Sequence, residues 1–174
     1  MTVLEAEPDD AMQAVREGRA DLAITYRLGE STRPDSGLRY RPLVSDTLRL
    51  VVPARSALAR KRTVSWSELA GESWICGWGA LGQIFDRFAQ EYGLEPHIAC
   101  RSSDYDFMQA LAGAGLGITL IPELALTDRH DTTPLTISPT TSRHVGLSVA
   151  PHLAQDHPAW MFEELMYEQV STIR

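Results

Sequence analysis

The chain has little positive charge, few cysteines and no long apolar segment. Its 174 residues contain 16 Lys and Arg against 23 Asp and Glu, a formal net charge of -7, so the basic surface that binding to a phosphate backbone requires is missing. Two cysteines are too few for a disulfide-stapled secreted domain, and no apolar run approaches the roughly 20 residues that span a bilayer. The first residues lack the pattern of a secretory signal. We expect a cytoplasmic protein that contacts neither DNA nor a membrane directly.

Patterns typical of metal sites and of common catalytic sites are also missing. The five histidines show no spacing that would place two on one helix face or join them to a cysteine pair as ligands. No serine lies between glycines after a strand, and the glycines from Gly77 to Gly82 lack the lysine of a phosphate-binding loop and the dinucleotide-binding spacing. We therefore expect no metal, no cofactor and no enzymatic activity.

Signals for strands and helices alternate along the chain. Ser65 with Glu68 matches a capping box and Pro8 and Pro158 stand at first helical positions. The helices expected from such signals are 8–17, 66–70, 84–92, one that starts from N-cap candidates at 102–104 and is broken at 115–117, and one from Pro158 that carries Met161, Leu165 and Met166. The strands expected from apolar runs are 3–6, 21–26, 38–43, 47–52, 74–76, 97–101, 118–121 and 145–149. This alternation predicts an α/β protein with a largely parallel sheet.

Three stretches resemble the effector-binding domain of LysR-type transcriptional regulators. They are 16–24, with REGRADLAI; 41–71, where a strand ending in VVP precedes SALA and the capped WSELAG helix; and 104–123, where AGLGI leads into LIP. The resemblance implies the type 2 periplasmic-binding-protein fold, in which two α/β lobes are joined by two crossing strands and a ligand lies between the lobes. It implies a lobe I of 1–45 and 136–174 and a lobe II of 46–135.

The same resemblance indicates where the chain begins relative to the family. Residues 3–6 match the second strand of the family's effector domain. We therefore expect the winged helix-turn-helix, the linker helix, and the first strand and helix of the effector domain to be absent from this chain.

Two stretches are candidate ligand-binding loops of lobe II. In open α/β sheets ligands bind beyond the carboxyl ends of strands, where helix N-termini present free N–H groups that suit anions. Gly77, Trp78 and Gly79 follow one expected strand, and the glycines would let the backbone approach a ligand that Trp78 covers. Arg101, Ser102, Ser103 and Asp104 follow another and could bind a carboxylate. The alternatives are a plain glycine-rich turn for the first, and helix capping by Ser103 or Asp104 for the second.

Four further candidates belong to lobe I and to the presumed hinge. Tyr26 and Arg27 end a strand of lobe I, and Arg27 could pair with an acidic effector, although a solvated loop arginine is the commoner situation. Ser45 and Thr47 lie at the first presumed hinge crossing, where a hydroxyl can reach a ligand, and could equally be turn formers.

Cys76 and Cys100 both lie on expected strands of lobe II. A thiol redox switch is one hypothesis, since some regulators of the resembled family sense oxidants. Buried cysteines more often act as small hydrophobic residues, and that is the favoured interpretation.

The favoured functional hypothesis is a sensor that binds a small acidic or aromatic metabolite and acts on DNA only through a domain outside this chain. Ligand binding would have to favour one arrangement of the lobes over another to have any effect. Alternatives are a periplasmic solute-binding protein, a fold-related enzyme, and a ligand-incompetent remnant that acts through protein contacts. Because a missing strand would expose a sheet edge, we also expect the chain to form a homo-oligomer.

Overall fold

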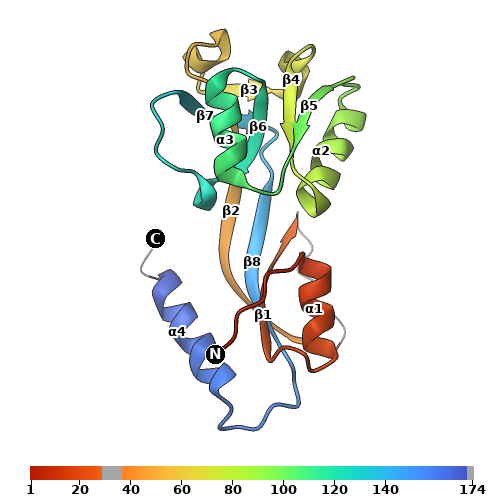
Figure 1. The fold of residues 1–174 in the computed structure, drawn as a ribbon, viewed down its shortest axis with the longest axis vertical. Coiled ribbons are helices and arrows are strands. Elements are labelled where there is room, and N and C mark those ends of the chain that lie inside the picture. Colours follow the sequence, from red (N-terminus) through yellow and green to blue (C-terminus); the bar gives the residue numbers. More distant parts are fainter. Residues whose placement is uncertain (29–36, 172–174) are drawn as a thin grey trace. The chain divides into compact units, whose positions relative to one another are not determined.

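The computed structural model describes residues 1–28 and 37–171 and divides into two compact units. Unit 1 comprises Met1–Ser45 with Arg143–Arg174, and unit 2 comprises Asp46–Ser142. The chain passes between them within β2 (Arg39–Pro53) and β8 (Ser142–Val149) (Figure 1). The sequence interpretation had grouped residues 136–142 with the C-terminal segment. In the structure they belong to unit 2, since β7 (Thr132–Ser138) pairs with other strands of that unit up to its last residue.

Unit 1 is built from α1 (Pro8–Arg16), β1 (Leu22–Leu28), α4 (Pro158–Ser171) and parts of β2 and β8. Pro8 opens α1, Asp9 and Asp10 lie in its first turn, and Gly18 follows it with φ +69°, which is the expected arrangement of helix-start and helix-stop residues. The apolar side of α1 packs on the strands. The buried cluster consists of Met12, Val15, Ala23, Leu38 and Ala150.

The expected strand at residues 3–6 is wrong. Residues 1–7 have no regular structure, and Val3 and Leu4 are 78% and 70% exposed. A strand exists only where a neighbour accepts its backbone hydrogen bonds, and within the described residues β1 pairs with β8 alone. Residues 3–6 have a composition that favours a strand, but no neighbouring strand pairs with them among the described residues, so the segment is irregular.

Unit 2 contains a mixed sheet and two helices. Its strands, besides the end of β2 and β7, are β3 (Thr63–Ser65), β4 (Ser73–Cys76), β5 (His97–Arg101) and β6 (Ile118–Pro122). Its α-helices are α2 (Gly79–Glu91) and α3 (Tyr105–Ala114), and short 3-10 helices span Ala57–Arg60, Trp66–Leu69 and Glu123–Ala125. β4 is parallel to β5 and β6, and β3 to β7, but β2 is antiparallel to β6 and β7.

The expectation of a largely parallel sheet is therefore wrong, because β2 runs opposite to the strands on both of its sides in unit 2. The two segments expected at 38–43 and 47–52 are in fact one 15-residue strand. The residues between them continue in extended conformation, so the pattern break at Ser45 and Asp46 marks no turn.

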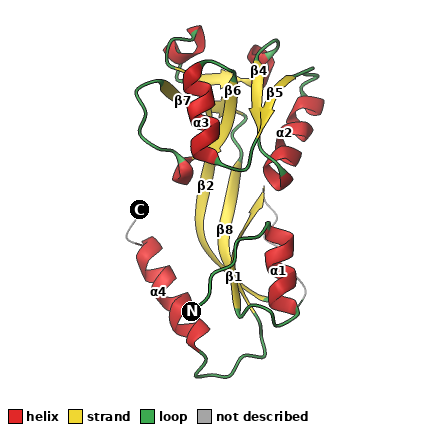
Figure 2. Ribbon diagram, viewed as in Figure 1, coloured by secondary structure: helices red, strands yellow, loops and turns green. Residues whose placement is uncertain are grey.

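The helices of unit 2 cover its sheet from different sides (Figure 2). Side chains alternate between the faces of a strand: Ile75 packs with Val51, Ile121, Met108 and Ala112 on the α3 side, whereas its neighbour Trp74 lies against Phe85 of α2, with ring centres 4.6 Å apart. Trp66 extends the aromatic cluster on that side and stacks on Phe88 at 4.6 Å. The carboxyl ends of β4 and β5 lie between these two packed layers.

Candidate functional site

The two predicted ligand-binding loops of unit 2 lie side by side. β4 and β5 are parallel neighbours in which Cys76 is opposite Arg101, and the amide of Ser102 donates a 3.0 Å hydrogen bond to the carbonyl of Cys76. β4 leads into α2 and β5 into α3 (Figure 1). The structure thus brings Gly77–Gly79 and Arg101–Asp104 to one edge of the sheet, which we call the β4–β5 edge.

The backbone at Gly77–Gly79 is tightly folded. A Cβ on Gly77 would lie 2.9 Å from the Leu81 side chain, so there is little room for one, and Gly79 has φ +56°, a conformation that favours glycine. Trp78 is the N-cap residue of α2 but makes no side-chain capping bond, and its indole is 56% exposed. The first N–H groups of this 13-residue helix are therefore not capped by Trp78.

Arg101 supplies the positive charge at this edge. Its guanidinium donates a 3.3 Å hydrogen bond to the carbonyl of Gly77, lies 3.8 Å from a carboxylate oxygen of Asp86, and stands 5.5 Å from the centre of the Trp78 ring. A guanidinium carries five N–H donors, more than these contacts use. Sequence reasoning missed Asp86, because no local sequence pattern connects a residue of α2 to an arginine of β5, 15 residues further along the chain.

Ser102, Ser103 and Asp104 have separate roles. The Asp104 carboxylate accepts a 3.0 Å hydrogen bond from the amide of Phe107, which confirms the prediction that Ser103 or Asp104 caps this helix. The Ser102 hydroxyl accepts a 3.1 Å bond from the Asp104 amide. Ser103 is exposed, and within the described residues its hydroxyl has no recorded hydrogen bond. Because Asp104 already places a negative charge at the start of α3, α2 is the helix whose N-terminus suits an anion.

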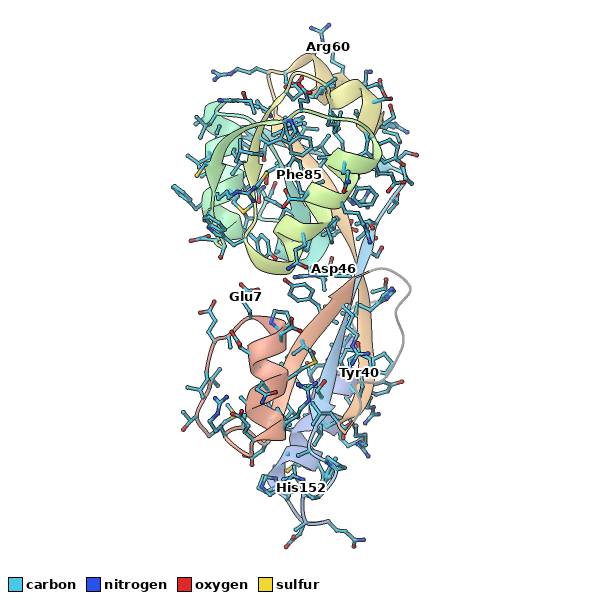
Figure 3. The ribbon with its side chains drawn as sticks, turned by 90° about the vertical axis from the view of Figure 1, so that its right-hand side faces the viewer. Glu7, Tyr40, Asp46, Arg60, Phe85 and His152 are labelled. Carbon is cyan, nitrogen blue, oxygen red and sulfur yellow. The ribbon has the colours of Figure 1, made fainter. Side chains whose placement is uncertain are left out.

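A small apolar hollow lies in the same region. It has a cavity volume of only about 10 Å³, far less than the roughly 300–1,000 Å³ of typical ligand pockets. Its wall consists of Trp74, Ile75, Cys76, Gly77, Leu81, Phe85 and Leu120. Phe85 is labelled in Figure 3 on α2. Burial raises the pKa of the Cys76 thiol to about 12, with the charge of Arg101 opposing that shift, so Cys76 is an apolar part of this wall.

Tyr26 and Arg27 lie within β1 of unit 1 and not in a loop. The guanidinium of Arg27 lies 4.5 Å from the centre of the Tyr40 ring, and Arg143 stands 5.1 Å from that of Tyr26. Burial raises the pKa of Tyr40, an effect that the charge of Arg27 opposes. The alternative that Arg27 is a solvated loop arginine is wrong, because β1 continues through Leu28. A role of Tyr26 and Arg27 in ligand binding stays a prediction.

Ser45 and Thr47 lie inside β2, so the alternative that they form a turn is wrong. The Thr47 hydroxyl is 3.4 Å from that of Ser142. The buried Asp46 between them, labelled in Figure 3, accepts a 3.0 Å hydrogen bond from the amide of Leu124. Sequence reasoning passed over Asp46, whose burial depends on a partner far along the chain.

The two thiols lie on opposite faces of the sheet of unit 2. Cys100 is opposite Ile75 and packs in its cluster, whereas the next residue of β4, Cys76, belongs to the other face of the sheet. Both are free cysteines. Among the described residues no group of three or more His, Cys, Asp or Glu could hold a metal ion. None of the helices that the structure describes is long and apolar enough to cross a membrane.

This fold, with a candidate ligand edge at strand ends, is that of the type 2 periplasmic-binding-protein class. Residues 1–170 match the family model of the LysR substrate binding domain, and the chain belongs to that family. It is 28% identical over 142 residues to the transcriptional dual regulator GltC of Bacillus subtilis strain 168, covering 78% of this chain and 46% of GltC. It is 26% identical over 141 residues to the helix-turn-helix-type regulator YybE of the same strain, covering 79% and 47%.

Solved structures show the same fold. The effector-binding domain of QuiR in complex with shikimate superposes with a TM-score of 0.77 at 19% identity, covering 96% of this chain and 79% of that one. The regulatory domain of Synechocystis PCC6803 CcmR in complex with 2-PG also gives 0.77, at 13% identity, covering 95% and 80%. The chain spans about half the length of the curated relatives it matches, and those relatives are transcriptional regulators.

Proposed function

We propose that this chain is the effector-sensing part of a LysR-type transcriptional regulator and binds a small anionic metabolite at the β4–β5 edge of unit 2. The observation that carries the proposal is the position of Arg101: its guanidinium lies beside Gly77 and Trp78, at the start of a helix whose N-cap side chain forms no capping bond. A carboxylate or phosphate bound there would be stabilised by the guanidinium and by backbone N–H groups together.

Three other side chains fit this ligand class. Trp78 presents an exposed ring that can cover the body of the metabolite. The exposed Ser103 hydroxyl can donate a further bond, and Ser102 already orders the loop. The effector-binding domain of QuiR is solved with shikimate and the regulatory domain of CcmR with 2-PG, which supports a small-molecule ligand for this fold but not its identity.

The proposed role in regulation is a change in the population of two conformations. A ligand shifts such an equilibrium only through a difference in its affinity for the two states. We propose that Tyr26, Arg27, Ser45 and Thr47 contribute to this difference in affinity. We also propose that the regulator acts in the cytoplasm and that another part of it contacts DNA, since this chain is acidic. The role is one of binding and not of catalysis.

Thermal unfolding with a panel of aliphatic and aromatic carboxylates and sugar phosphates tests the proposal. A ligand present at about 100 times its dissociation constant adds roughly 2.7 kcal/mol of stability. We expect Ser103→Ala and Trp78→Ala to weaken the shift caused by the active compound, because neither side chain makes a recorded hydrogen bond that the fold would lose. Arg101→Met should abolish it.

The matched control is Arg87→Met on the exposed side of α2, where the guanidinium lies over Phe88 at 5.1 Å. This variant should keep the full shift. A compound could stabilise Arg101→Met and Ser103→Ala as much as it stabilises the unchanged chain. In that case the ligand binds elsewhere and the β4–β5 edge is not the site.

A further inference from the structure

Asp86 lies beside Arg101 at the β4–β5 edge but is not hydrogen-bonded to it. One of its carboxylate oxygens stands 3.8 Å from a terminal nitrogen, Nη2, of the Arg101 guanidinium, which is beyond the reach of a hydrogen bond. Within the described residues no hydrogen bond to this carboxylate is recorded, and its side chain is 63% exposed. The edge therefore presents an acceptor, Asp86, next to a donor, Arg101, and neither saturates the other.

The packing of α2 holds this pair in place. Gly82 and Asp86 are four residues apart on α2 and so share one face of the helix. A Cβ on Gly82 would stand 3.6 Å from Nη1 of Arg101, so this face of α2 packs against the guanidinium. The same Nη1 donates a 3.3 Å hydrogen bond to the Gly77 carbonyl. Because the loop already holds Nη1, Nη2 is the terminal nitrogen that can bond to a ligand, and Asp86 is the carboxylate next to it.

A ligand carboxylate bonded to Nη2 would meet the negative charge of Asp86. Two carboxylates side by side with no donor between them repel one another, which lowers affinity, although water screens part of the effect at an exposed group. A hydrogen-bond donor on the carbon next to the ligand carboxylate would remove this penalty. The carboxylate would then bond to Arg101 and the donor to Asp86, in charge-assisted bonds of roughly 2.8 Å.

We propose that Asp86 selects the ligand of the β4–β5 edge, and that this ligand is a carboxylic acid with a hydroxyl or ammonium group on the adjacent carbon. The inference rests on the proposed function, because it requires that Arg101 binds the carboxylate. Hydroxyl and ammonium groups can both donate to Asp86, whereas the oxygen of a 2-oxo acid can only accept and would face the Asp86 oxygens without a proton between them. A site that pairs a ligand donor with a fixed acceptor discriminates against the analogue that lacks the donor.

Calorimetric titration with matched acids tests this selection. One set is 3-phenyllactate, phenylalanine, phenylpyruvate and 3-phenylpropionate, which differ only at the carbon next to the carboxylate, and equivalent sets carry methyl, isobutyl and carboxyethyl side chains. We expect the hydroxy or amino acid of a set to bind at least about fivefold more tightly than its 2-oxo and unsubstituted counterparts, since a hydrogen bond to a charged group is lost in both. The tighter of the two identifies the donor.

Asp86→Asn is the decisive variant, because an amide can donate to a 2-oxo group as well as accept from a hydroxyl. This variant should lose the preference for the donor and bind the 2-oxo acid at least as tightly as the hydroxy acid. Its cooperative unfolding should be unchanged, since the fold loses no recorded hydrogen bond. Glu91→Gln at the last position of α2 is the matched control. It removes one negative charge from the same helix and should keep the preference.

The outcomes separate this inference from the proposed function. Equal or tighter binding of the 2-oxo or unsubstituted acids by the unchanged chain overturns the inference, as does a preference that Asp86→Asn leaves intact. In both cases a loss of binding in Arg101→Met would still support the proposed function. Failure of every set to bind also overturns the inference, and the sugar phosphates of the thermal panel then test the anion site separately. If the preference persists in Arg101→Met, the ligand binds elsewhere and both proposals fail.

Discussion

Gly82 lies so close to Gly77 that a Cβ added to Gly82 would stand 2.8 Å from the Gly77 carbonyl oxygen. That same oxygen accepts the hydrogen bond from Arg101. The first turn of α2, the glycine loop and the guanidinium therefore form one packed arrangement, and a Cβ at Gly82 would also stand 3.6 Å from the Arg101 guanidinium.

We expect Gly82→Ala to lower the free energy of unfolding by about 1–3 kcal/mol, the usual cost of forcing a methyl group into a filled space. It should also weaken binding of an anionic ligand by displacing the Gly77 carbonyl. Urea unfolding and ligand titration measure the two effects. The control is Gln83→Ala, an exposed neighbour on the same helix that should change stability by less than about 0.5 kcal/mol. Equal stability of the two variants would contradict the packing described here.

Local signals predicted helix ends well, because their physics is local. The amide of Ser65 donates a 2.8 Å hydrogen bond to the Glu68 carboxylate, as the capping box predicts, and the Ser65 hydroxyl donates to the same carboxylate at 2.7 Å. Asp104 caps α3, and Gly115 ends it with φ +87°. In each case a few adjacent residues satisfy groups that the helix itself leaves unpaired.

Features that depend on distant partners were not visible in the sequence. The helix from Pro158 was expected to be apolar around Met161 and Leu165, yet both are at least half exposed and the buried positions are Ala159 and Glu163. Glu163 is buried because arginines of β2 reach it from more than 120 residues away. The sequence placed both loops of the candidate site at strand ends, but only the parallel pairing of β4 and β5 puts them together.

The cysteines should differ sharply in reactivity. Burial raises the pKa of Cys76 to about 12, so near neutral pH almost none of it is the reactive thiolate. Cys100 is only partly buried. Iodoacetamide treatment of the folded chain, followed by mass spectrometry, should modify Cys100 first and Cys76 only after unfolding. Mild oxidation should produce no bond between the two, as they lie on opposite faces of the sheet. Early modification of Cys76, or a disulfide between Cys76 and Cys100, would support the hypothesis of a thiol redox switch.

Glu68 should make stability depend on acidity. Hydrogen bonds from Lys61 and then from the amide and hydroxyl of Ser65 lower the pKa of Glu68 from 4.5 to about 2. A carboxyl group whose pKa is lower in the folded state stabilises the fold above its unfolded pKa, and that contribution is lost as the pH falls from about 4.5 towards 2. Urea unfolding through this window should show a weaker pH dependence for Glu68→Gln, and Lys61→Met should remove part of it. An unchanged slope in Glu68→Gln would contradict the assignment.

The attachment of α4 to β2 allows a buried and an exposed ion pair to be compared on one helix. The Arg39 guanidinium bonds to the Glu163 carboxylate, which is 1% exposed, and it lies 4.6 Å from the Trp160 ring centre. The neighbouring Glu164, 63% exposed, accepts a 2.6 Å bond from Arg41. Arg39→Met leaves the Glu163 carboxylate buried with only Arg41 nearby, at 3.9 Å.

Because an uncompensated buried charge is costly, Arg39→Met should lower the free energy of unfolding by about 2–4 kcal/mol. Glu164→Gln should lower it by less than about 1 kcal/mol, since water screens an exposed pair. Urea unfolding at low and high salt separates the two cases, because salt should reduce the effect of Glu164→Gln and leave most of that of Arg39→Met. If both substitutions cost the same and respond equally to salt, Glu163 is hydrated in solution, and α4 is held to β2 by its aromatic contacts with Arg39 and Arg41 instead.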